Sequence, residues 1–233
     1  MTSTFTLDYH GQPLRGEHTP GQRGNVLMIH GGSKSRRALE KYQHLFHHLA
    51  FGTTAFDCLG HGESGGTLED SSLASRTDQA RTVADYIAGC GAPVTACMGV
   101  SMGAYNALQL SATRPLRGLL LMVPGVYTHT ASRVPFGPEF STLIRQPRSW
   151  QHSDAWQLAS CYTGNLLVVA GEQDDVIPAE IPPRLYQAAT RASHRQLWTV
   201  PGADHHSIWQ QISRSPERVR QAQDRFIRCL SGA

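Results

Sequence analysis

The chain has 233 residues, of which 40% are hydrophobic and 17% charged, and its formal net charge is +3 with neutral histidines. This length and composition predict one globular domain over residues 1–233. The 21 lysines and arginines are scattered, which argues against a nucleic-acid or anionic-membrane surface. No apolar run approaches the roughly 20 residues of a membrane-spanning helix.

The N-terminus and the cysteines indicate a reducing compartment. Residues 1–5 contain neither a basic stretch nor an apolar stretch, so we expect no secretory signal. The five cysteines are odd in number and form no C-x-x-C pair, which argues against a disulfide framework or a zinc site. A cytoplasmic location is therefore expected.

The predicted elements alternate between strands and helices along most of the chain. Residues 5–9 alternate apolar and polar side chains, and together with residues 14–17 they predict an N-terminal antiparallel hairpin. Short apolar runs predict further strands at 26–29, 53–56, 94–98, 119–123, 166–170 and 196–200. Helical spacing or capping residues predict helices at 38–49, 77–88 and 102–111 and from Ser215 onward.

This order predicts an α/β fold: a mostly parallel sheet of about eight strands with helices on both faces. Residues 124–164 break the alternation with four prolines and six aromatic residues, and we interpret them as a short cap or lid insertion. Most of these aromatic side chains are expected to pack the insertion onto the domain. A few are expected to face a substrate pocket and to select the substrate. Arg133, Arg145 and Arg148 favour a solvated basic surface over an anion site.

A candidate nucleophile lies between the predicted strand 94–98 and the predicted helix 102–111. The motif Gly99-Val100-Ser101-Met102-Gly103 places a serine in a strand-to-helix turn, where its hydroxyl is exposed at the edge of the sheet. The two glycines leave room for neighbouring backbones, and the helix N-terminus favours a developing oxyanion. The alternative is a glycine-rich turn with an incidental serine.

A serine nucleophile needs a base and an acid that orients the base. The loop after the strand 166–170 offers Asp174 and Asp175, with Glu172 a poorer candidate because it is nearer the strand end. The loop after the last strand offers His205 and His206, and only one of two adjacent side chains can point inward. Both loops follow the carboxyl ends of predicted parallel strands, where open α/β sheets bind ligands.

Four motifs in this order resemble the α/β-hydrolase superfamily. They are His30-Gly31-Gly32, the turn from Asp57 to Ser64 (DCLGHGES), the serine motif, and the acidic loop with the terminal histidine. The chain is most similar to the compact serine hydrolases grouped with monoglyceride lipases, bacterial carboxylesterases and serine aminopeptidases. The matching motifs span residues 26–206.

The resemblance implies specific roles. The family pattern G-x-x-D-x-x-x-P selects Asp174, and the pattern P-G-x-x-H selects His205. The family's oxyanion hole implies the backbone amides of Met102 and Gly32. The resemblance also implies that His30 and His61 form structural hydrogen bonds near the site, outside the chemistry itself. Asp204 is expected to be a solvated or loop-capping carboxylate.

The expected activity is hydrolysis of a small-molecule carboxylic ester through an acyl-enzyme on Ser101, with no cofactor and no metal. Thioester hydrolysis is the nearest alternative, followed by peptide or amide hydrolysis. A ligand-binding protein without activity is the alternative outside enzymes.

Overall fold

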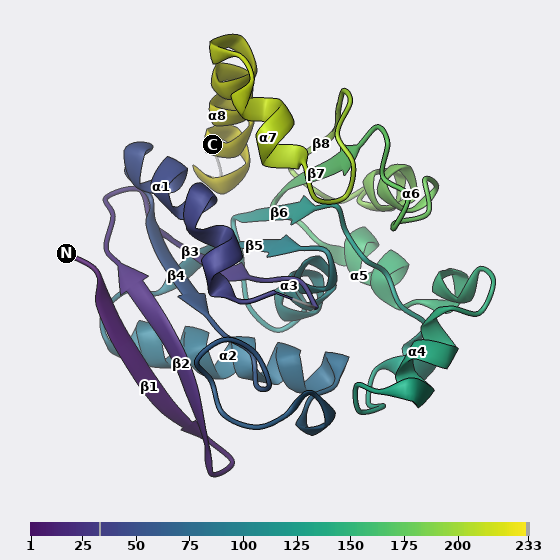
Figure 1. Ribbon diagram of the computed structural model, residues 1–233. Helices are drawn as coiled ribbons and strands as arrows, with labels where there is room; N and C mark the ends of the chain where they lie inside the picture. The colour runs from purple at the N-terminus through teal and green to yellow at the C-terminus, as the bar shows by residue number, and fades with distance from the viewer. Residues whose placement is uncertain (33, 232–233) are drawn as a thin grey trace.

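In a computed structural model, which describes residues 1–32 and 34–231, one sheet of eight strands runs through the molecule in the order β1-β2-β4-β3-β5-β6-β7-β8 (Figure 1). The strands are β1 (Ser3–Tyr9), β2 (Gln12–Thr19), β3 (Asn25–Ile29), β4 (Gly52–Phe56), β5 (Val94–Val100), β6 (Gly118–Met122), β7 (Asn165–Gly171) and β8 (His194–Val200). Strand β1 pairs antiparallel with β2, and β2 antiparallel with β4, whereas β4, β3 and β5 to β8 run parallel. The predicted α/β class, with a mostly parallel sheet and an N-terminal hairpin, is confirmed.

Helices cover both faces of this sheet. They are α1 (Glu40–His48), α2 (Leu73–Gly89), α3 (Met102–Ser111), α4 (Pro138–Ile144), α5 (Ala155–Cys161), α6 (Ile181–Ala188), α7 (Ile208–Ser213) and α8 (Pro216–Ser231). Helices α1, α7 and α8 share one core cluster with the sheet, and α2, α3, α5 and α6 share the other. Because both faces are covered, β3, β4 and β6 are buried at every position. Within residues 1–32 and 34–231, the helices are all too short or too polar to cross a bilayer.

Helices α4, α5, α6 and α7 are additions to the predicted elements, and α2 begins earlier than predicted. The first turns of α2 and α6 explain their differences. Helix α2 begins at Leu73, four residues earlier than expected, because the hydroxyl of Ser72 accepts a hydrogen bond from the amide of Ser75 (3.1 Å). Helix α6 is not among the predicted elements, and it contains Pro182 and Pro183, a residue type that is more typical of loops. Both prolines lie in its first turn, where the backbone amides have no acceptor within the helix.

The segment 124–164 connects β6 to β7 and packs beside α3. Its side chains Phe136, Phe140, Trp150 and Tyr162 are buried in the core cluster on that face of the sheet. The hydroxyl of Tyr105 in α3 donates a hydrogen bond to the carboxylate of Asp154 (2.8 Å) and so ties the segment to the domain. In Figure 1, α4 and α5 lie on the opposite side of the sheet from α1.

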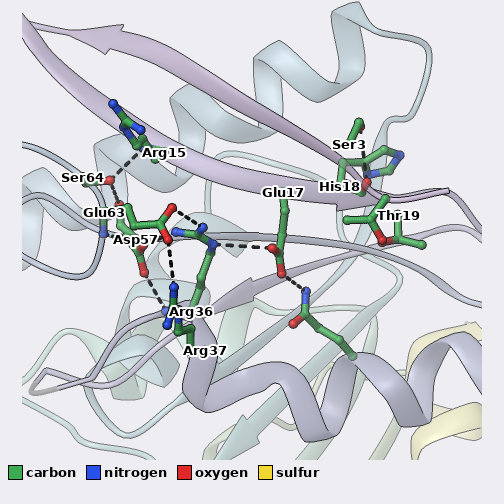
Figure 2. A network of polar contacts seen from close by, with 12 residues as sticks. Ser3, Arg15, Glu17, His18, Thr19, Arg36, Arg37, Asp57, Glu63 and Ser64 are labelled. Atoms are coloured by element: carbon green, nitrogen blue, oxygen red, sulfur yellow. Dashed lines mark hydrogen bonds and ion pairs between the residues drawn. The ribbon is translucent and has the colours of Figure 1, made fainter.

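A buried ionic network surrounds Arg36, which precedes α1 (Figure 2). The amide of Arg36 donates to Asp57 Oδ1 (2.7 Å), and its guanidinium pairs with the other oxygen of the same carboxylate. The guanidinium also contacts Glu63 (2.7 Å) and Glu17 (3.6 Å). Asp57 follows β4 and accepts a further hydrogen bond from the amide of Glu63 (3.0 Å). The network therefore joins the segment after β3 to the turn after β4.

We expect Arg36→Met to lower the free energy of unfolding by about 3–5 kcal/mol, because it leaves the buried carboxylate of Asp57 without its guanidinium partner. The matched control is Arg37→Met, since the side chain of Arg37 is 72% exposed and contacts only Glu63 in the same network. Its removal is expected to change stability little. Denaturant unfolding of both variants measures the difference, and equal losses would contradict the assigned importance of Arg36.

Candidate active site

Ser101 lies between β5 and α3 in a strained backbone conformation, with φ 53° and ψ −116°. A positive φ is costly for a side chain with a Cβ and persists only where the surroundings impose it. Here the amide of Ser101 donates to the carbonyl of Met122 (2.9 Å), and its carbonyl accepts from the amide of Gly125 (3.0 Å). These bonds hold the serine at the carboxyl edge of the sheet.

The two glycines of the serine motif lie where backbones approach closely. A Cβ on Gly99 would collide with the carbonyl of Gly103. A Cβ on Gly103 would collide with the carbonyl of Ile29 at the end of β3. Any larger residue at either position would push α3 away from the sheet and move Ser101.

The structure brings Ser101, His205 and Asp174 together from three separate loops. Ser101 Oγ lies 3.1 Å from His205 Nε2, and His205 Nδ1 lies 2.9 Å from Asp174 Oδ2. Because the carboxylate can only accept, Nδ1 carries the proton of the neutral imidazole and Nε2 is free to accept from the hydroxyl. The side chains of His205 and Asp174 are 7% and 6% exposed, so the pair is shielded from water.

The loop after β7 stabilises the charged form of Asp174. Burial alone would raise the pKa of this carboxyl, but the hydrogen bond to His205 and those from the amides of Ile177 and Val176 outweigh it and lower the pKa below its usual value. Both amides lie 2.9 Å from Oδ1. The carboxylate is therefore ionised at neutral pH and oriented on both of its oxygens.

The other acidic and histidine candidates take no part in this hydrogen-bonded series. Asp175 and His206 are exposed to solvent. Glu172 accepts a hydrogen bond from the backbone of the loop after β8 (2.8 Å). Asp204 Oδ1 accepts hydrogen bonds from the backbone amides of His206 (2.8 Å) and Ser207 (2.9 Å), and so caps its own loop. Of all the acidic and histidine candidates, Asp174 and His205 are the two that form the hydrogen-bonded series to Ser101.

Two backbone amides are candidates for the oxyanion hole. The amide of Met102 lies in the first turn of α3, where no helical carbonyl can accept from it. Gly32 packs against the Met102 side chain, since a Cβ on Gly32 would lie 3.0 Å from Met102 Cε. His30 Nδ1 donates to the carbonyl of Gly31 (2.7 Å), and the planar peptide thereby fixes the direction of the Gly32 amide. The amide of Cys58 donates to His30 Nε2 (3.0 Å), which fixes this tautomer.

His61 supports the same loop from the other side. Its Nε2 lies 2.6 Å from the carbonyl of Gly32, and its ring is 4.9 Å from the ring of His30. Burial, together with the guanidinium of Arg76, lowers the pKa of His30 well below its usual value, so this imidazole is neutral. His30 and His61 both bond to the backbone of the loop that carries Gly32.

A pocket of about 120 Å³ opens beside Ser101. Its walls come from the ends of β5 and β6 and from three further groups of residues: Gly31, Gly32 and Lys34; Ala38, Leu39, Lys41 and Tyr42; and His205, His206 and Ile208. The expectation that aromatic residues of 124–164 face the pocket is wrong, because no residue of that segment lines it. These side chains are buried against α3 instead, on the other face of the sheet. The sequence offered no signal for the contribution of α1, whose apolar residues have ordinary helical spacing.

A sequence model described as the alpha/beta hydrolase family matches residues 26–163. An uncharacterised protein of Mycobacterium tuberculosis is 27% identical over 194 residues, which are 81% of this chain. The chain spans 65% of the length of this relative.

Solved structures share the fold over nearly the whole chain. Est1E from Butyrivibrio proteoclasticus with bound ferulic acid has a TM-score of 0.72 at 18% identity, over 94% of this chain and 95% of its own. The monoacylglycerol lipase of Paleococcus ferrophilus has a TM-score of 0.70 at 18% identity, over 94% and 98%. The thioesterase domain from the curacin biosynthetic pathway has a TM-score of 0.67 at 15% identity, over 96% and 98%.

The lowered pKa of Asp174 makes its contribution to stability depend on pH. Ionisation favours the folded state, so the contribution is present above the ordinary value of 3.8 and is lost as the pH falls through the lower folded value. We expect the melting temperature of wild type to exceed that of Asp174→Asn at pH 7, and the difference to shrink under acid conditions. The exposed neighbour provides the control, and Asp175→Asn should leave the melting temperature at pH 7 close to that of wild type. A difference between wild type and Asp174→Asn that grows on acidification would contradict the assignment.

Proposed function

Because the chain belongs to the alpha/beta hydrolase family, we propose that it is a hydrolase that cleaves small carboxylic esters with Ser101 as its nucleophile. The observation that carries this proposal is the hydrogen-bonded series from Ser101 through His205 to Asp174. The strained turn at Ser101 supports it, since such strain is found where a side chain must be presented to a substrate.

The first step is acylation of the enzyme. Ser101 Oγ attacks the ester carbonyl carbon while His205 Nε2 takes the hydroxyl proton. The carbonyl oxygen becomes an oxyanion that accepts hydrogen bonds from the amides of Met102 and Gly32. The carbon–oxygen bond to the alcohol then breaks, and His205 gives its proton to the leaving oxygen.

The second step releases the acid. Water attacks the acyl carbon and gives a proton to His205, and the proton then returns to Ser101 Oγ as the acyl–serine bond breaks. Asp174 holds the His205 ring in the required tautomer and stabilises the imidazolium that forms in both steps. Atoms of the chain and of water suffice for this cycle.

Thioester hydrolysis is the second candidate activity. It would use the same groups, and the curacin thioesterase domain has the same fold over 96% of this chain. Initial rates on an acetyl thioester and on the matching oxygen ester distinguish the two activities. Amide or peptide hydrolysis would require the same series to protonate a poorer leaving group.

We expect Ser101→Ala to lower kcat on 4-nitrophenyl acetate by about 10⁴-fold or more, because acylation loses its nucleophile. We expect His205→Gln to cause a loss of similar size. The adjacent His206, which is exposed and lines the pocket, is the competing candidate for the base, and His206→Gln should lose far less turnover than His205→Gln. Full activity of Ser101→Ala, or loss of activity only in His206→Gln, would refute these roles.

Covalent labelling separates an enzyme from a ligand-binding protein on the same fold. A fluorophosphonate probe should label wild type on one serine and leave folded Ser101→Ala unlabelled, as intact-protein mass spectrometry would show. An unlabelled wild type that binds esters without turnover would favour the binding-protein alternative.

A further inference from the structure

The chain contains only two lysines, and both line the pocket beside Ser101. Lys34 follows the loop that carries Gly32, and Lys41 lies in the first turn of α1. The other basic residues among the 21 are all arginines, and none of them lines this pocket. The segment 124–164 carries the three arginines for which an anion site was the less favoured expectation. These residues, Arg133, Arg145 and Arg148, are exposed and lie away from the pocket.

The protein leaves the two lysine charges uncompensated. Neither ammonium group has a carboxylate within 4.0 Å in the described part of the chain, whereas Arg36 and Arg37 nearby are both paired. No aspartate or glutamate is among the described residues that line the pocket, and the other titratable side chains there are Tyr42, His205 and His206.

Both lysines are exposed to solvent and so accessible to a ligand, and the surroundings of Lys41 favour an anionic one. Lys41 Nζ lies 5.4 Å from the ring centroid of Tyr42, and partial burial lowers the pKa of Lys41. A partly desolvated ammonium group gains by pairing with an anion. A concave surface lined by one sign of charge also concentrates ligands of the opposite sign.

The pocket beside Ser101 encloses only a small group. Its volume of about 120 Å³ is smaller than a cavity of about 150 Å³ that holds benzene. Leu39, Tyr42 and Ile208 supply apolar wall beside the catalytic groups. A group of a few carbon atoms that ends in a charge therefore fits both the size and the chemistry of the pocket.

We propose that the substrate is a short carboxylic ester bearing a carboxylate or phosphate group, and that Lys34 and Lys41 bind this group. The proposal rests on the proposed ester hydrolysis at Ser101. Lys34 also lines a second groove, which passes Gly60 and Leu68 and shares Gly32 with the first. An anion on either the acyl side or the alcohol side of the ester can thus reach a lysine.

Pairs of esters matched in shape test the charge preference. Monomethyl succinate and methyl 4-methylpentanoate compare an anionic with a neutral acyl group. The acetate esters of 3-hydroxypropanoate and of 3-methylbutanol do the same for the alcohol, and acetoxyethyl phosphate tests phosphate. Acid release at constant pH gives kcat and KM for each. We expect wild type to prefer the anionic member of at least one pair by about tenfold in kcat/KM, mainly through KM, and less so at high salt.

Variants of the two lysines test whether these residues cause the preference for anionic over neutral esters. Lys34→Met and Lys41→Met should each lower the ratio of kcat/KM for the anionic ester over the neutral one. Lys41→Arg should restore part of the ratio, because it keeps the charge but changes its shape. Arg37→Met removes an exposed cation from the same segment without touching the pocket, and it should leave the ratio unchanged.

The outcomes separate this inference from the proposed function. If wild type hydrolyses neutral esters as well as or better than anionic ones, or if the lysine variants leave the ratio unchanged, the anionic substrate is overturned while ester hydrolysis stands. If no ester is hydrolysed, ester hydrolysis fails. Calorimetric binding of monomethyl succinate, the acetate ester of 3-hydroxypropanoate and acetoxyethyl phosphate to Ser101→Ala, with and without Lys41→Met, then decides the anion site. Absence of binding that depends on Lys41 would overturn it.

Discussion

The left-handed turn at Ser101 is the constraint on which the arrangement of the site depends. A positive φ at a residue with a Cβ lifts the side chain out of the sheet, and it is stable only because β5 and α3 are anchored on both sides of it. The same turn requires glycine at positions 99 and 103, since the chain passes within contact distance of itself and of β3. The turn thus fixes Oγ at the point that the two loops after β7 and β8 can reach.

The loop with Gly31 and Gly32, which borders the site beside Ser101, is held by buried polar contacts. Arg36 is paired with Asp57, while His30 and His61 bond to the carbonyls of Gly31 and Gly32. All of these contacts involve residues between β3 and α1. The backbone amide of Gly32, in the same stretch, is a candidate oxyanion donor. Gly31 and Gly32 leave room for a ligand but have more backbone freedom than other residues, and the hydrogen bonds at their carbonyls restrict it.

The two faces of the sheet have different relations to the pocket. The face covered by α2, α3 and α5 also buries the aromatic residues of 124–164, and it contributes to stability through apolar packing. The face covered by α1 and α7 borders the pocket, and there Lys34 and Lys41 lie beside apolar walls. The positive charges of the pocket are those of Lys41 in α1 and of Lys34 before it. A short ester with a negative charge would therefore bind on this side of the sheet.

The sequence by itself determined the fold class and the order of the chemical groups along the chain. Apolar runs such as 119–123 identify buried strands because a strand covered on both faces needs an apolar side chain at every position. The resemblance to known motifs favoured Asp174 and His205 over their neighbours. Only the tertiary structure decided that Arg36 is buried, that 124–164 packs away from the pocket, and that both lysines line it. These contacts join residues distant in the chain, and local periodicity does not specify which side chains meet across a folded domain.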